Sequence, residues 1–249
     1  GFDAKVVDFD QNLPAEISAF GPDVVWPLVH GSLGEDGSLQ SLLEGVGVPY
    51  VGSTPAQAML ASNKPTAKAL VGAAGLDTPG WIALPQLLFR QLGAHNVLGM
   101  INSSLTFPLV VKPSSGGSAL GMSRAQDPTD LRSAMVDAFS YEEHVMLERF
   151  VGGRDIAVSV VYLEEGPIAL PPVEVSTDDG HYDYEARYTT DESEYFVPAR
   201  LSNDEMTDVQ AAAIQIHELL GLRDLSRIDF IVDDNGSFWF IDANVSPGM

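Results

Sequence analysis

The sequence predicts an α/β protein, and three features of its 249 residues support this. Short apolar runs rich in Val, Ile and Leu alternate with segments that carry helix-capping signals. Alternating strands and helices are typical of α/β architecture, in which helices cover a sheet. Near the end of the chain, Asn235-Gly236 lies between two alternating apolar runs, which predicts an antiparallel hairpin. This hairpin adds α+β character to the predicted fold class.

The start of the chain predicts a small N-terminal α/β unit. Apolar runs rich in Val indicate strands, and a loop with three glycines leads into a segment with helical spacing. We expect strands at residues 5–9, 23–29 and 48–51, a helix at residues 38–45, and a unit that spans residues 1–53.

Two consecutive helices follow, because a capping residue before a proline occurs twice. Thr54 precedes Pro55, and Asn63 precedes Lys64-Pro65. Proline is tolerated in the first helical turn, where its missing N–H would have no partner. We expect helices at about residues 55–61 and 65–74, then an apolar strand at residues 107–113 and a helix at residues 129–139.

The second half of the chain begins with two apolar runs on either side of Gly152-Gly153. A two-residue glycine loop between such runs predicts a β-hairpin. Residues 178–200 are polar, aromatic-rich and without periodicity, which indicates a long loop that is either functional or disordered. A capping box at Ser202 then starts a helix that should end at Gly221. We place a central domain at residues 54–147 and a C-terminal domain at residues 148–249.

The charge is strongly acidic. Thirteen Lys and Arg residues stand against 35 Asp and Glu residues, a formal net charge of −22. Such a surface repels nucleic-acid phosphates and anionic membranes. No apolar run of 18 residues occurs, and the absence of cysteine excludes disulfides and thiolate metal sites. The sequence favours a cytoplasmic protein with no nucleic-acid and no membrane partner.

The Asn235-Gly236 hairpin places carboxylates opposite each other. With a two-residue loop, Asp229 lies opposite Asp242 and Arg227 opposite Asn244, all on one face. Like charges in this position are destabilising, and oxygen ligands favour Mg²⁺ or Mn²⁺ as the compensating partner. The alternative is a solvated acidic hairpin without metal. If the carboxylates repel each other, removing one should not lower the stability of the metal-free chain.

Two lysines are candidates for binding an anion. Lys112 ends the strand at residues 107–113 and precedes a Ser/Gly-rich loop whose N–H groups can cradle phosphate, although such loops are more often plain turns. Because Lys112 ends its strand, we expect its side chain outside the core. Lys64, between two helices, could equally be a surface lysine. His30, in a glycine-containing loop, is a weaker catalytic candidate because it has no evident partner.

Taken together, these segments resemble the D-alanine–D-alanine ligases of the ATP-grasp superfamily. The resemblance covers essentially the whole chain in the correct order, and the joint match is specific even though each motif alone is not. The matching segments are His30-Gly-Ser-Leu-Gly-Glu-Asp-Gly37 with Gln40 and Leu43-Glu44, Pro49-Tyr-Val-Gly-Ser53, Asn63-Lys64, Phe107–Pro113 with Gly117-Ser118, Tyr182–Tyr188, Arg227-Ile-Asp229 and Asp242–Met249.

The resemblance implies an ATP-grasp fold and an ATP-dependent ligase that joins two D-alanines through an acyl phosphate, for peptidoglycan precursors. It implies ATP, two Mg²⁺ ions (or Mn²⁺) and a homodimer. On this basis the catalytic residues are His30, Ser118, Tyr188, Arg227 and Gly248; the nucleotide-binding residues are Lys64, Lys112, Glu148, Arg149, Phe150, Val151, Asp155 and Arg187; the metal ligands are Asp229, Asp242 and Asn244.

Four positions depart from the family pattern. Ala119 stands in place of a serine, Arg187 in place of a lysine, and Asp155 and Asp242 in place of glutamates. The resemblance also implies family segments before and after this sequence that bind the amino-acid substrates. One alternative is a sister ligase that uses D-lactate or D-serine as second substrate, against which Tyr188 argues. The other is a non-catalytic ATP-grasp binding protein, against which the complete metal and oxyanion set argues.

Overall fold

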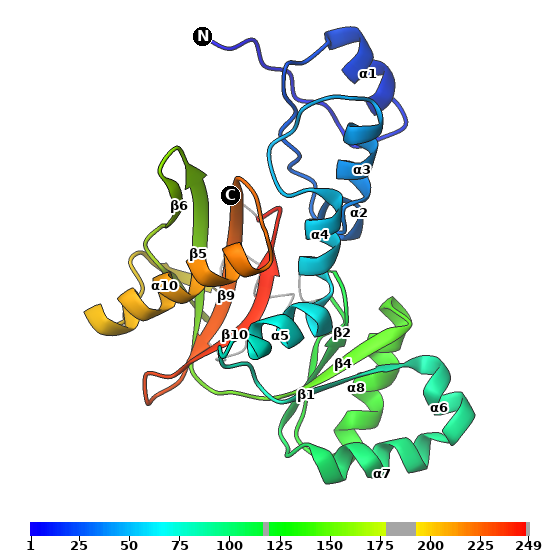
Figure 1. Ribbon diagram of the computed structural model, residues 1–249. Helices are drawn as coiled ribbons and strands as arrows, with labels where there is room; N and C mark the ends of the chain where they lie inside the picture. Colours follow the sequence, from blue (N-terminus) through cyan, green and yellow to red (C-terminus); the bar gives the residue numbers. More distant parts are fainter. Residues whose placement is uncertain (117–119, 178–192, 248–249) are drawn as a thin grey trace.

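The computed structural model describes residues 1–116, 120–177 and 193–247. Two antiparallel sheets lie side by side, and a separate group of N-terminal helices extends from one end (Figure 1). This mixed α/β architecture agrees with the predicted fold class.

The first sheet is built from the middle of the chain and has the strand order β1-β4-β2-β3. Its apolar face packs against helices, and the buried core includes Leu109, Val111, Leu131, Val145 and Leu147. The elements are β1 (Trp81–Pro85), α6 (Gln86–Leu92), α7 (Ala94–Ser104), β2 (Leu109–Pro113), β3 (Ser123–Ala125), α8 (Pro128–Tyr141) and β4 (His144–Arg149). The predicted strand at residues 107–113 and helix at residues 129–139 are confirmed as β2 and α8.

The second sheet has the strand order β10-β9-β5-β7-β8, with β6 paired to β5. The capping box at Ser202 starts α10, which packs on this sheet (Figure 1). The elements are β5 (Arg154–Leu163), β6 (Gly166–Ala169), β7 (Val173–Thr177), β8 (Ser193–Phe196), α10 (Asn203–Leu219), β9 (Leu225–Val232) and β10 (Phe238–Asn244).

Helices α4 (Pro55–Ser62) and α5 (Lys64–Ala73) connect the N-terminal helices to both sheets, and they confirm the two predicted helices. Ala58 and Ala61 of α4 and Ala67 and Val71 of α5 are buried in the core of the second sheet. In Figure 1, α5 lies where the two sheets meet. Side chains of α5 can therefore reach both sheets.

The N-terminal unit differs from the prediction. It forms α1 (Leu13–Phe20), α2 (Ser32–Glu35) and α3 (Ser38–Gly45), and only the last of these was expected. Within the described residues its sheet is reduced to one parallel bridge, between Val25 and Tyr50. Residues 5–9 form no strand and are mostly exposed, because no neighbouring strand offers them backbone partners.

The predicted hairpin at Gly152-Gly153 is wrong. β4 pairs with β1 and β2 of the first sheet, whereas β5 pairs with β6, β7 and β9 of the second. The glycines therefore join the two sheets. Gly153 has a φ of 155° and lies so close to β9 that an added Cβ would be 2.3 Å from the carbonyl oxygen of Val232. Gly153 is needed because the two backbones approach closely here. In the sequence alone, a glycine of this kind looks the same as one that forms a hairpin turn.

Replacing Gly153 with Ala is expected to destabilise the protein by about 1–3 kcal/mol, because the methyl group collides with backbone that cannot move freely. Thermal or urea unfolding measures this loss. Gly152→Ala is the matched control, since its Cβ would meet only the Phe150 ring at 3.7 Å. Equal stability of the two variants would contradict the predicted close approach.

Candidate functional site

The β9–β10 hairpin brings the predicted metal ligands together. The pairs at the site are those expected, but the register near the turn differs. Asp229 lies opposite Asp242 and Arg227 opposite Asn244, as predicted. Near the turn, however, Phe238 pairs with Val232, which is one residue out of step with a two-residue loop. An irregularity between Phe240 and Asp242 restores the alignment. The pairing at the site is therefore set by a bulge as well as by the turn.

Asp229 is compensated by neighbours on the same hairpin face. The Arg227 guanidinium donates from Nε and Nη2 to the two Asp229 carboxylate oxygens, at 2.7 and 2.9 Å. Asn244 donates from Nδ2 to Asp229 Oδ2 at 2.9 Å. A bidentate pair of this kind fixes both orientation and charge. Three of the predicted site residues thus form one connected group.

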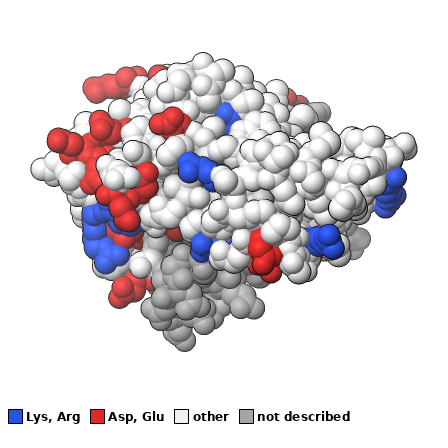
Figure 2. Space-filling model, turned by 90° about the horizontal axis from the view of Figure 1, so that it is seen from below, with Lys and Arg blue, Asp and Glu red and all other residues white. Residues whose placement is uncertain are grey.

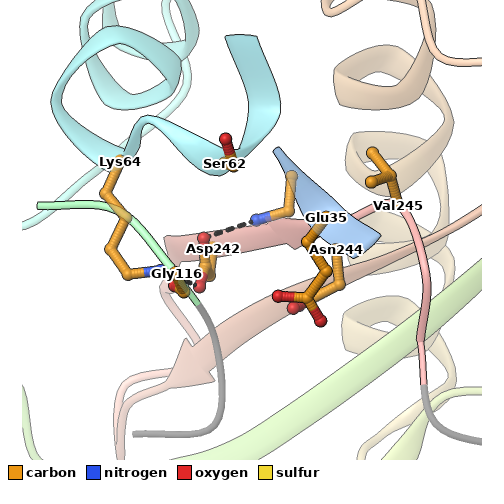
Figure 3. Close-up of a pocket in the computed structure, with 8 residues that line it drawn as sticks. Glu35, Ser62, Lys64, Gly116, Asp242, Asn244 and Val245 are labelled. Atoms are coloured by element: carbon orange, nitrogen blue, oxygen red, sulfur yellow. Dashed lines mark hydrogen bonds and ion pairs between the residues drawn. The ribbon is translucent and has the colours of Figure 1, made fainter. Parts of the chain in front are cut away.

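Asp242 is compensated by a residue from another element. Lys64, at the first turn of α5, lies with its Nζ 2.5 Å from Asp242 Oδ2 and 2.8 Å from the carbonyl oxygen of Gly116 (Figure 3). The Lys64 side chain is only 9% exposed, so it is not a surface lysine. Burial raises the pKa of Asp242, but the positive charges of Lys64 and Lys112 outweigh it and hold the pKa below its ordinary value. Asp242 is therefore ionised at neutral pH.

Glu35, for which no role was predicted from the sequence, lines a pocket together with Lys64 and Asp242. The pocket is formed by residues from α2, α4, α5, β10 and the segment around Gly116 (Figure 3). Burial and the nearby charge of Asp242 raise the pKa of Glu35. Its position within the Gly34-Glu35-Asp36-Gly37 motif was the available signal. The lining residues are Glu35, Ser62, Lys64, Gly116, Asp242, Ala243, Asn244 and Val245.

A second charged group lies between the two sheets. Lys112 of β2 donates to Glu148 Oε2 of β4 at 2.8 Å, and Lys68 of α5 makes an ion pair with the other carboxylate oxygen. All three residues are buried, at 6%, 2% and 1% exposed respectively for Lys112, Glu148 and Lys68. The expectation that Lys112 lies outside the core is wrong, because its side chain is enclosed with Glu148 of β4 and Lys68 of α5.

Burial alone raises the pKa of Glu148, but Lys112 and Lys68 outweigh it and keep the carboxyl ionised. For Lys68 burial dominates, and its pKa falls from 10.5 to about 8 despite the attraction of Glu148. The unfolded chain holds this proton with the ordinary pKa. Charged Lys68 therefore lowers the stability of the folded state below pH 8. This loss of stability disappears as pH rises from about 8 to 10.5.

The other described nucleotide-binding candidates follow β4 and begin β5. Arg149 lies over the Trp239 ring, 5.0 Å from its centroid, and Phe150 lies under the Arg124 guanidinium at 3.7 Å. Val151 is half-buried next to them, and Asp155 lies on β5 opposite Ile231. These residues belong to the segment of chain that crosses from β4 of the first sheet to β5 of the second.

His30 lies at the N-terminal side of the site. Its Nδ1 is 3.1 Å from the carbonyl oxygen of Ser246, which follows β10, so the loop that carries it reaches the end of the hairpin. The remaining candidates, Ser118, Arg187, Tyr188 and Gly248, lie outside the described residues, as does the departure at Ala119.

The side-chain oxygens of Asp229, Asp242 and Asn244 suit a hard divalent cation that is also coordinated by a nucleotide. Among the residues that the structure describes, no group of three or more His, Cys, Asp or Glu side chains could hold a metal ion alone. Asp229, Asp242 and Asn244 instead offer two carboxylates and one amide oxygen on one hairpin face. Mg²⁺ is typically held by one or two carboxylates with phosphate oxygens completing its shell. The residues therefore fit Mg²⁺ held together with a phosphate.

The face seen in Figure 2 carries no continuous basic surface that would suit a polyanionic partner. Figure 2 shows acidic side chains gathered on one side of the face seen there, with Lys and Arg scattered rather than continuous. Nucleic-acid binding needs a continuous basic surface. Among the described helices, none is long and apolar enough to cross a membrane.

Comparisons with known proteins identify the same family along the chain. Residues 5–53 match the family described as D-ala D-ala ligase N-terminus, and residues 70–249 match D-ala D-ala ligase C-terminus. A D-alanine--D-alanine ligase of Bordetella petrii is 35% identical over 249 residues, which is 100% of this chain and 74% of that protein. A D-alanine--D-alanine ligase of Synechococcus sp. (strain JA-3-3Ab) is 35% identical over 253 residues, 100% of this chain and 75% of that protein.

Two solved structures share the architecture. The VanG D-Ala:D-Ser ligase from Enterococcus faecalis has a TM-score of 0.80 and 30% identity, covering 91% of this chain and 64% of that one. The D-alanine-D-alanine ligase from Coxiella burnetii has a TM-score of 0.73 and 26% identity, covering 91% of this chain and 60% of that one. The chain thus spans less than two thirds of either structure. The predicted ATP-grasp fold is confirmed, and the chain belongs to the D-alanine–D-alanine ligase family.

Proposed function

We propose that this protein is an ATP-dependent, ADP-forming ligase that joins two D-alanines into D-alanyl-D-alanine for peptidoglycan precursors. The observation that carries the proposal is the convergence of Lys64 and Asp242 with the Arg227–Asp229–Asn244 group at the end of one hairpin. Family membership supports the substrates. A cytoplasmic homodimer, and domains at residues 1–53, 54–147 and 148–249, belong to the same proposal.

The residues suit phosphoryl transfer, which depends on positioning and on neutralising phosphate charge. Lys64, next to Asp242, and Lys112, next to Glu148, are the two lysines that would contact the phosphates. Asp229, Asp242 and Asn244 would hold Mg²⁺, which neutralises phosphate oxygens when bound. Asn244 would use its Oδ1, since its Nδ2 already donates to Asp229. Arg227, held by Asp229, adds a fixed positive charge for an oxyanion.

The chemistry proceeds in two steps. The carboxylate of the first D-alanine attacks the γ-phosphorus of ATP, the bond to ADP breaks, and an acyl phosphate forms. The amine of the second D-alanine then attacks the acyl carbon, loses a proton, and displaces inorganic phosphate. The role of Arg227 would be to stabilise the negative oxygen of that tetrahedral intermediate.

D-Serine is the second candidate for the second substrate, because the VanG D-Ala:D-Ser ligase is similar over 91% of this chain. D-Lactate and a non-catalytic nucleotide-binding role are the remaining alternatives.

Phosphate release from ATP by the full-length protein tests the proposal. With Mg²⁺ and D-alanine alone we expect ADP, phosphate and the dipeptide in equal amounts. Mixtures of D-alanine with D-serine or D-lactate test the sister ligases, and a mixed product in excess of the dipeptide would replace our assignment. Binding of Mg·ADP without turnover in any mixture would support the non-catalytic role.

A further inference from the structure

Lys68 is a buried lysine that contacts both sheets and that the ligase chemistry above does not use. It lies on α5 and is 1% exposed. Its Nζ donates to the carbonyl oxygen of Phe240 on β10 at 2.8 Å and to Thr78 Oγ1 at 3.0 Å. The same ammonium makes an ion pair with Glu148 of β4. One ammonium therefore ties the metal-binding hairpin of the second sheet to the first sheet.

The charges of this group do not cancel. Lys68 and Lys112 contribute two positive charges, and Glu148 contributes one negative charge that is divided between them. A carboxylate that binds a single lysine neutralises it, whereas a carboxylate shared by two leaves a net charge of +1. In a buried group of low dielectric, that unbalanced charge attracts an anion strongly.

We propose that Lys68 is a positioning residue for nucleotide binding: by holding one carboxylate oxygen of Glu148, it leaves Lys112 with positive charge available to a nucleotide phosphate. This inference rests on the proposed function, because it takes Lys112 as a phosphate contact. Lys68 itself is enclosed by Thr78, Phe240 and Glu148 and acts through Glu148.

Lys68→Met is the first test, since methionine keeps much of the buried volume and removes the charge. Glu148 then neutralises Lys112, and affinity for Mg·ADP, measured by calorimetry on the full chain, should fall roughly ten-fold or more. Lys5→Met is the matched control for net charge, because Lys5 pairs with Glu16 on the surface. It should bind Mg·ADP as the parent does.

The double variant Lys68→Met/Glu148→Gln separates this role from a structural one. In this proposal Glu148 is the partner of the two lysines and not a nucleotide contact, because its two carboxylate oxygens pair with them. Removing the carboxylate frees Lys112 again, so the double variant should bind Mg·ADP more tightly than Lys68→Met. If Lys68 only holds the sheets together, losing a second buried contact should weaken binding further. Binding weaker than in the single variant would therefore overturn the inference. Thermal unfolding of each variant shows that the comparison is made on folded protein.

The pH profile is an independent readout. Lys68 faces Glu148 of β4 and Lys112 of β2, with Asp242 of β10 at longer range, and its pKa is about 8. The parent should therefore lose affinity for Mg·ADP as pH rises through 8, and Lys68→Met should lack this step. If the parent and Lys68→Met bind Mg·ADP equally, the role of Lys68 is wrong while the proposed function stands. A parent that binds no Mg·ADP overturns the proposed function as well.

Discussion

Asp242→Asn is expected to abolish metal-dependent nucleotide binding and to lower the stability of the nucleotide-free protein. Asp242 is both a candidate metal ligand and the partner of Lys64, whose side chain is 9% exposed. Removing one member of a buried pair leaves the other charge without compensation, which costs about 3–5 kcal/mol in full burial. Because Asp242 is 17% exposed, we expect about 2–3 kcal/mol here.

The expected sign reverses the one that the sequence suggested. If Asp229 and Asp242 repelled each other, removing one carboxylate would not lower stability. In the structure Asp229 is neutralised by Arg227, and Asp242 by Lys64. The expectation of net repulsion is therefore wrong, because it left out both the pairing of Arg227 with Asp229 within the hairpin and the charge of Lys64, which lies on α5.

Thermal unfolding with and without Mg·ADP measures both effects of Asp242→Asn. A bound ligand stabilises the native state by mass action, so the parent should show a melting shift that the variant lacks. Asp234→Asn is the matched control: it makes the same charge change at an exposed position of the same hairpin. A variant that keeps the full shift would mean that Asp242 holds no metal.

The sequence predicted the helices with strong caps and the residues that meet on the hairpin face. These signals are local: a capping box, a proline in the first turn, or an Asn-Gly turn restricts the backbone of its own segment. The Gly152-Gly153 signal failed because glycine permits either a turn or close backbone approach, and only the partner strands decide between them. The bulge after Phe240 likewise has no signature in the residues around it.

The buried charges could not be predicted for a related reason. Lys68 and Glu148 are 80 positions apart, and their pairing depends on α5 lying where the two sheets meet. A single lysine in a helix usually lies on its exposed face. The family resemblance identified Lys112 and Glu148 but gave no role to Lys68. Tertiary packing, rather than any motif, makes these three side chains one group.

Lys112→Met is expected to weaken binding of Mg·ADP by about 10- to 100-fold, the range that one lost charge-assisted hydrogen bond of about 1.5–3 kcal/mol gives. The fold should survive, because Glu148 keeps Lys68 as its partner and the remaining pair is neutral. Calorimetry measures the affinity and thermal unfolding the stability. A variant that folds and binds Mg·ADP as the parent does would remove Lys112 from the nucleotide site.

Lys112→Met and Lys68→Met remove the same charge from the same buried group, so each controls for the other. If Lys112 contacts the phosphate and Lys68 acts through Glu148, only the Lys68 variant can be rescued. Adding Glu148→Gln to Lys112→Met should restore no affinity, because the contacting ammonium is gone. Rescue of both single variants would instead show that net charge alone determines binding. Lys112 would then have no direct contact with the phosphate.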